Sequence, residues 1–214
     1  MERNKNLRYW LLVCGILNVV FYLLHDVIGA RFYPGYNWMA QAVSDLTATD
    51  APSRLIASEL TKIHGIFSCV ACTLICISAK ELWKETSEKI LRQGVYLFVT
   101  MHWISAIGYS LFPLTGSGYD GSFQSFVHVY VITVLVVLLS IVSLIFIAVG
   151  GFKSGNKVLA WCAVVAFLLM FLGAAGSGLV PRQYFGIPER FSTYSAVCFT
   201  AVIAVIAYLN FRKE

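Results

Sequence analysis

Six long apolar runs alternate with short polar segments along the chain. The runs cover approximately residues 10–30, 56–79, 93–113, 124–149, 158–180 and 194–211. Most of them reach the roughly 20 residues that a helix needs to cross about 30 Å of hydrocarbon, and the last run is the shortest. A segment in hydrocarbon satisfies its backbone hydrogen bonds as a helix or within a closed barrel, and a barrel shows short alternating runs instead. The pattern therefore predicts an all-α, polytopic membrane protein, a six transmembrane helix bundle that forms a single domain over residues 1–214.

Composition and charge agree with this class and add an orientation. The chain is 58% hydrophobic and 13% charged, whereas soluble domains are about a quarter charged. If the N-terminus lies inside, eleven of the sixteen Lys and Arg residues fall on the cytoplasmic side, as the positive-inside rule favours. We therefore predict a multi-pass protein of the plasma membrane with both termini cytoplasmic. The net charge of +5 follows from this topology, so we expect no nucleic-acid partner.

The longest polar segment, YPGYNWMAQAVSDLTATDAPSR at residues 33–54, lies between the first two runs. Tyr36 and Trp38 suit the headgroup level of a membrane, where aromatic rings are enriched. Ser44 and Asp45 fit either a turn that anchors the loop or a carboxylate that faces the bundle interior as ligand, orienter or base. We expect the segment to fold back as a lid over the outer mouth of the bundle and to bring Asp45 to the helical histidines.

Ionisable residues inside the runs mark a candidate site. His25, His64 and His128 lie at similar depth near the outer side, and His102 lies near the middle of its run. Such residues are costly in the membrane and usually face the bundle interior. Neutral imidazoles with nearby carboxylates can bind zinc, act as general acid and base, or simply hydrogen-bond one another, and the spacing leaves all three open. The candidate metal ligands are His25, Asp26, Asp45, His64 and His128.

The segment before the last run supplies a further pair, Glu189 and Arg190. These two residues fit a salt bridge at the start of the last helix, or an Arg that holds an anionic headgroup. With the loop residues they complete the candidate substrate-binding set, which comprises Tyr36, Trp38, Ser44, Asp45, His102, Glu189 and Arg190. The catalytic candidates are Asp45, His64 and His128.

Four stretches, FYPGYNWMAQAVSDLTATDAPSR, GYSLFPLTG, SFQSFVHVY and GIPERFS, resemble the membrane family called domain of unknown function 998 (DUF998) over nearly the whole chain. A more distant likeness is to the Frag/DRAM/Sfk group of six-helix proteins, which also carry an S-D element after the first helix and are associated with lipid handling. The resemblance implies a six-helix membrane fold and no established reaction. The residues that carry it are Ser44, Asp45, Phe112, Pro113, His128, Glu189 and Arg190.

Three functions fit these observations. The first is a membrane protein whose outer polar pocket binds a lipid or small amphiphile, with a membrane lipid as the partner and no cofactor. The second is a metal-dependent intramembrane hydrolase, in which histidines and an aspartate hold zinc and activate water against a lipid ester or amide. The third is a proton-coupled transporter with His102 as the deep relay; it has less support, because broken paired helices and a mid-membrane carboxylate are missing from the sequence.

Overall fold

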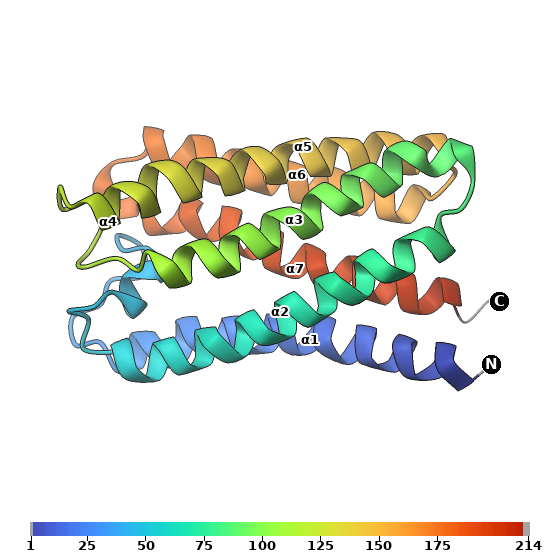
Figure 1. The fold of residues 1–214 in the computed structure, drawn as a ribbon. Helices are drawn as coiled ribbons and strands as arrows, with labels where there is room; N and C mark the ends of the chain where they lie inside the picture. Colours follow the sequence, from blue (N-terminus) through green and yellow to red (C-terminus); the bar gives the residue numbers. More distant parts are fainter. Residues whose placement is uncertain (1, 212–214) are drawn as a thin grey trace.

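The computed structural model describes residues 2–211 of the chain, and the side chains of residues 6–210. Long antiparallel helices form a bundle in which α1 begins and α7 ends at the same end (Figure 1). We call this end the terminal end and the opposite end, which carries residues 32–53 and 112–122, the loop end. The long helices are α1 (Glu2–Arg31), α2 (Arg54–Leu82), α3 (Lys89–Leu111), α5 (Thr133–Lys153), α6 (Lys157–Leu179) and α7 (Gly186–Phe211). The short elements are η1 (Val43–Thr47), η2 (Thr86–Glu88), α4 (Phe123–Phe126), the π-helical turn η3 (Val127–Ile132) and η4 (Arg182–Tyr184).

The prediction of six spanning helices is confirmed. Six helical segments of the described chain are long and apolar enough to cross a membrane, and α4, η3 and α5 together make one of them, Phe123–Lys153. The last helix begins at Gly186, ahead of the apolar run that starts near residue 194. The difference arises because α7 begins with polar residues, Glu189 in the first turn and Arg190 directly after it, and Arg190 is buried by polar partners rather than by hydrophobicity.

Close pairing of the helices leaves α7 near the centre of the bundle. The main packing pairs are α1 with α2, α3 with α5, and α6 with α7, and α7 also contacts α1 and α2 (Figure 1). The α3–α5 pair depends on glycine, since a Cβ added at Gly150 would overlap the backbone of Leu91, and one added at Gly94 would lie 2.7 Å from the nitrogen of Ile147. Small residues let membrane helices approach closely in this way.

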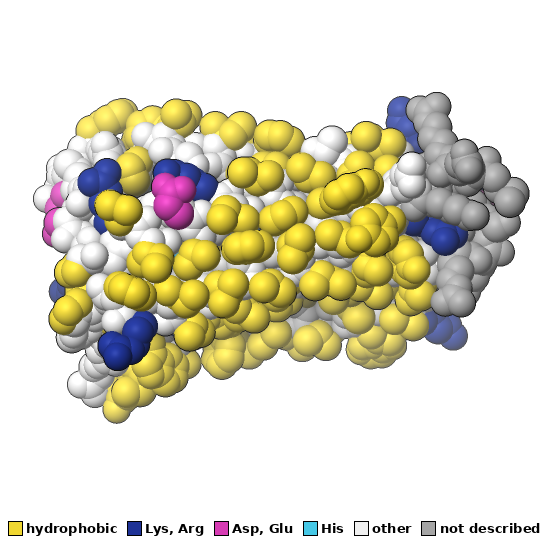
Figure 2. All heavy atoms as spheres, turned by 90° about the horizontal axis from the view of Figure 1, so that it is seen from below, with side chains coloured by type: hydrophobic (Ala, Val, Ile, Leu, Met, Phe, Trp, Pro, Cys, Tyr) yellow, Lys and Arg dark blue, Asp and Glu magenta, His cyan; other side chains and the backbone are white. Residues whose placement is uncertain are grey.

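The outer surface carries a wide apolar band. Figure 2 shows hydrophobic side chains covering the middle of one face, with the charged side chains gathered toward its two ends. Large exposed hydrophobic residues occur on all the long helices, among them Leu55, Leu138 and Val158. An apolar surface of this extent suits contact with lipid chains.

The interior differs between the two halves of the bundle. The terminal half contains the main hydrophobic cluster, which includes Leu11, Trp83, Leu91, Ile147 and Ile203. Between the middle of the bundle and the loop end, buried polar side chains come from several helices. They include Asn18, His25 and Asp26 from α1, Ser68 from α2, His102 from α3, His128 from η3, and Arg190 and Thr200 from α7. Buried polar side chains are energetically costly in a membrane protein, so this part of the interior is a candidate functional site.

Residues 32–53 pack against the loop end, whereas the predicted approach of Asp45 to the histidines stays a prediction. Leu46 in η1 is fully buried and packs with Val43 and Ala57. The backbone nitrogen of Thr49 donates to the carbonyl of Leu114 at 2.9 Å, and the nitrogen of Gly186 donates to the carbonyl of Met39 at 2.7 Å. The segment is thus fixed both to the α3–α4 loop and to the start of α7.

Candidate functional site

Arg190 organises the loop end from the first turn of α7. Its side chain makes a bidentate ion pair with Asp26 of α1, with Nε 2.9 Å from Oδ2 and Nη2 2.8 Å from Oδ1. The residue is only 7% exposed. Its other acceptors are the carbonyl oxygens of Trp38, Gln41 and Gly186, at 2.7, 3.0 and 3.1 Å, and the hydroxyl of Tyr36, at 2.8 Å. Every nitrogen of the guanidinium therefore has a partner within the protein, as a buried charge requires.

Aromatic residues complete the surroundings of this ion pair. The guanidinium carbon of Arg190 lies 6.0 Å from the ring centroids of both Tyr36 and Trp38. The Tyr36 hydroxyl donates to the carbonyl of Ala42 at 2.8 Å, and burial raises the pKa of Tyr36 above its ordinary value. The hydroxyl of Tyr194 also donates to Oδ2 of Asp26. The structure thus brings Tyr36, Trp38 and Arg190 together, and the contacts it shows tie the loop to α1 and α7.

Glu189 is placed differently from its neighbour Arg190. Its carboxylate lies within electrostatic range of Arg190, and also of Asp26, Asp45 and Tyr22. One hydrogen bond reaches it within the described chain, from the backbone nitrogen of Val43 at 3.3 Å. Because Arg190 pairs with Asp26, Glu189 is left as a partly buried carboxylate with spare hydrogen-bonding capacity.

Asp45 links two loops. Its Oδ2 atom accepts from the backbone nitrogen of Ala42 at 3.2 Å and from the hydroxyl of Ser117 at 2.7 Å. Burial raises the pKa of the Asp45 carboxyl, and these two hydrogen bonds oppose the rise. The preceding residue, Ser44, accepts a hydrogen bond at its carbonyl from the Thr47 hydroxyl at 3.0 Å. Asp45 therefore has the anchoring contacts of a turn, and its hydrogen bonds within the described chain go to loop groups rather than to a histidine.

Backbone carbonyls determine the tautomers of two histidines. His64 Nδ1 lies 2.9 Å from the carbonyl oxygen of Asn18, and His128 Nδ1 lies 2.7 Å from that of Phe112. A carbonyl only accepts, so in each neutral ring Nδ1 carries the proton and Nε2 is left as an acceptor. Neither Nε2 atom has a hydrogen-bond partner within the described residues.

His102 has partners on both sides of its ring. Its Nδ1 lies 3.2 Å from the hydroxyl of Ser68, and its Nε2 lies 2.8 Å from that of Thr200. The Thr200 hydroxyl is also placed to donate to the carbonyl of Ala196 at 3.2 Å, so it accepts from Nε2, and Ser68 donates to Nδ1. These contacts connect α2, α3 and α7 near the middle of the bundle.

His25, unlike His102, has no hydrogen-bond partner on either side of its ring within the described chain. The residue is 3% exposed. The ring lies against Tyr22, with centroids 5.7 Å apart, and Tyr22 also contacts His64 at 4.9 Å and Tyr194 at 5.8 Å. Asn18, fully buried one turn before Tyr22, donates to the carbonyl of Val197 at 3.1 Å and leaves its own Oδ1 without a partner. Buried polar atoms are nearly always paired, so these exceptions call for an explanation.

These residues define the loop-end cluster, which comprises Asn18, Tyr22, His25, Asp26, His64, Glu189, Arg190 and Tyr194. Sequence reasoning missed Asn18, Tyr22 and Tyr194. A signal for the first two was present, because residues 18, 22 and 25 recur at helical spacing and share one face of α1. Tyr194 had no such signal, since only the fold brings α7 beside α1.

The predicted metal ligands are separated by their contacts. His128 packs against Tyr109, with ring centroids 4.6 Å apart, and bonds to the end of α3. His25 and His64 belong to the loop-end cluster instead, and Asp26 pairs with Arg190. Within the described part of the chain, no group of three or more His, Cys, Asp and Glu residues is placed to hold a metal ion. The zinc site stays a prediction.

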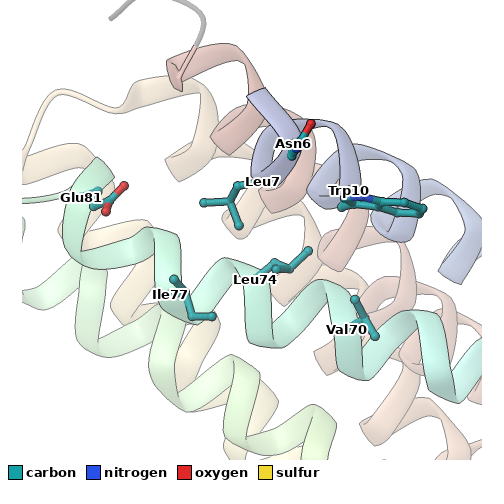
Figure 3. Close-up of a pocket in the computed structure, with 7 residues that line it drawn as sticks. All are labelled: Asn6, Leu7, Trp10, Val70, Leu74, Ile77 and Glu81. Atoms are coloured by element: carbon teal, nitrogen blue, oxygen red, sulfur yellow. The ribbon is translucent and has the colours of Figure 1, made fainter. Parts of the chain in front are cut away.

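A second feature lies on the membrane-facing surface near the terminal end. Figure 3 shows a groove between α1 and α2 that is lined mainly by apolar side chains, with a polar residue, Asn6 or Glu81, on each of the two helices. Its volume is about 700 Å³. The remaining lining residues are Leu7, Trp10, Val70, Leu74 and Ile77.

Together, the six apolar spans and the polar interior of the loop half define a multi-pass membrane protein with a buried polar cluster at one end. The chain belongs to the family described as protein of unknown function (DUF998), whose model matches residues 10–206. The match covers both the six spans and the loop end, and it confirms the resemblance in the sequence. No curated protein and no solved structure matches the chain.

Proposed function

We propose that this protein binds a membrane amphiphile whose polar headgroup occupies the loop-end cluster while its apolar part lies along the helices. The apolar band gives a lipid molecule access to the helices, and the polar half of the interior offers hydrogen-bonding groups that lipid chains cannot satisfy. Amphiphiles combine both characters in one molecule.

One observation carries the proposal. Both nitrogens of His25 and the Oδ1 atom of Asn18 are buried without a partner. An unmade hydrogen bond costs a buried group about 1–3 kcal/mol. A sequence that keeps such groups on one face of α1 gains from them when a polar ligand or water completes their hydrogen bonds.

Residues 32–53 close the loop end of the bundle, so a ligand would enter from the surrounding membrane. Residues 32–53 are tied to Arg190 through three residues, Tyr36, Trp38 and Gln41, and Asp45 ties them to Ser117 of the α3–α4 loop. A segment with so many attachments acts as a fixed cover. The headgroup then enters laterally between helices.

Native mass spectrometry of protein purified from lipid mixtures tests the proposal. We expect an amphiphile to remain bound to the wild type, and to be lost or reduced in His25→Leu, which removes the partnerless ring but keeps an apolar side chain. Trp10→Ala, in the groove at the terminal end, is the matched control and should keep the bound molecule. Equal retention by the wild type and His25→Leu would contradict the proposed site. Release of a cleaved product with time would instead favour the hydrolase.

A further inference from the structure

We infer that the loop-end cluster selects an amphiphile with an ammonium headgroup, that is, a long-chain amine or an amine-bearing lipid. This inference rests on the proposed function and names the chemistry of its ligand. The chemistry follows from an inventory of the charges and hydrogen-bonding groups that the protein itself leaves unused.

The buried cation of the cluster is already engaged. An anionic headgroup would need free donors on a positive side chain, and Arg190 is the cation in the cluster. Its Nε and Nη2 atoms bond to Asp26, and Nη1 bonds to backbone carbonyls. A phosphate at this position would have to displace Asp26 and leave its carboxylate buried without a countercharge, which is strongly unfavourable.

The unused groups are mostly acceptors. Glu189 has two carboxylate oxygens and one hydrogen bond, from Val43. His64 offers Nε2, because its Nδ1 proton points to the carbonyl of Asn18. Asn18 offers a buried Oδ1. His25, with one donor and one acceptor in its neutral form, favours neither sign. A complementary ligand therefore brings more donors than acceptors, and an ammonium group brings three donors and no acceptor.

The charge of the cluster points the same way. The Asp26–Arg190 pair is neutral as a unit, whereas Glu189 has no cationic partner within hydrogen-bonding distance in the described chain. A carboxylate at membrane depth is costly unless it is paired. An ammonium headgroup beside Glu189 supplies the missing countercharge.

Aromatic rings add a second recognition element. Tyr22 lies within electrostatic range of Glu189 and makes edge contacts with the rings of His25 and Tyr194. Tyr109 of α3 is also within electrostatic range of Glu189. The faces of tyrosine rings attract cations, and the attraction is stronger where water is excluded. Neutral alcohols of the same chain length carry no positive charge, so they gain nothing from this cation–π attraction.

The test compares three amphiphiles with the same alkyl chain, a primary amine, an alcohol and a phosphate monoester, by binding to the purified wild type in nanodiscs of neutral lipid. We expect the amine to bind at least about tenfold more tightly than the alcohol, and the phosphate to bind most weakly. Glu189→Gln should abolish the preference for the amine, because its amide oxygen can still accept from Val43 while the charge is lost. Glu59→Gln is the matched control, since Glu59 pairs with Lys62 on the surface, and it should keep the preference.

Each outcome has one meaning. Equal binding of amine and alcohol by the wild type, or tightest binding of the phosphate, would overturn the ammonium inference and leave amphiphile binding intact. Binding of none of the three would overturn the proposed function itself. If Glu189→Gln does not fold, His64→Leu replaces it, because it removes the second unused acceptor and should reduce the preference several-fold. An unchanged preference in the folded variant would also overturn the inference.

Discussion

Arg190 and Asp26 join the last helix to the first through two parallel hydrogen bonds of 2.9 and 2.8 Å, although 164 residues separate them in sequence. The same guanidinium holds the carbonyls of Trp38 and Gln41, so one side chain fixes both the α1–α7 contact and the covering loop. Glu189, its neighbour in sequence, takes no part in this pair, and its carboxylate accepts from the backbone nitrogen of Val43 instead. The two adjacent charges have different roles.

Replacing Arg190 with Ala should destabilise the protein by about 3–5 kcal/mol, because Asp26 remains buried without a countercharge. Thermal unfolding in detergent measures the change. Arg182→Ala, at an exposed position in η4, is the control and should have little effect. In a double-mutant cycle, Asp26→Asn should recover part of the loss in the Arg190→Ala background. Additive losses would show that the ion pair does not couple the two helices.

Gly186→Ala should loosen the covering loop. A Cβ at this position would overlap the carbonyl oxygens of Trp38 and Gln41, so the loop must move or the helix start must shift. We expect a loss of about 1–3 kcal/mol and faster proteolysis within residues 32–53. Gly178→Ala is the matched control, because a Cβ at that position meets no other atom within 4 Å. Equal proteolysis of the two variants would contradict the close contact.

His102→Leu should cost more stability than His25→Leu, by at least about 1 kcal/mol in ligand-free protein. His102 gives up bonds to both Ser68 and Thr200, whereas His25 gives up none within the described chain. The free energies of unfolding of the two variants, measured in the same detergent, give the two losses of stability to be compared. A larger loss for His25→Leu would mean that bound water or a retained ligand already satisfies that ring.

Asp45 should give the protein a pH dependence of defined sign. Burial raises the pKa of its carboxyl above the ordinary value of 3.8, so the folded state binds the proton more tightly than the unfolded state does. The contribution to stability is then complete at low pH and is lost as pH rises through the folded-state pKa. We expect the wild type to lose stability relative to Asp45→Asn from about pH 4 upward. Unfolding titrations of both proteins measure this difference.

The hydrogen bonds of Asp45 and of the nearby Asp120 allow the pH dependence to be assigned to one residue. Ser117→Ala removes a hydrogen bond that lowers the pKa of Asp45, so the loss of stability should still begin near pH 4 but become larger and extend to higher pH. Hydrogen bonds from Ser125, Thr115 and Ser122 lower the pKa of Asp120, which therefore titrates below this window. A parallel pH profile for the wild type and Asp45→Asn would rule out Asp45 as the source.

The spans could be predicted from sequence because each of them is encoded locally, as a run of apolar residues of sufficient length. The partners of the polar residues could not. Glu189 and Arg190 are adjacent, yet their contacts are with Val43 and Asp26, which only the folded bundle brings near. Asn18 and Tyr22 were visible as polar positions on the face of the helix that carries His25, but their importance depends on α7 packing there. Likewise, the turn chemistry around Asp45 allowed an anchor or a site residue, and its bonds to Ala42 and Ser117 are those of an anchor.

The Asp26–Arg190 pair also constrains how the molecule is made. Asp26 leaves the ribosome with the first helix, and Arg190 follows 164 residues later, which at about 5–20 residues per second is a delay of roughly 8–30 s. During that time Asp26 lacks the countercharge that Arg190 supplies in the folded bundle. Early α1 must therefore keep Asp26 in water or beside the insertion machinery, and the chain can complete its membrane assembly only when the last helix arrives.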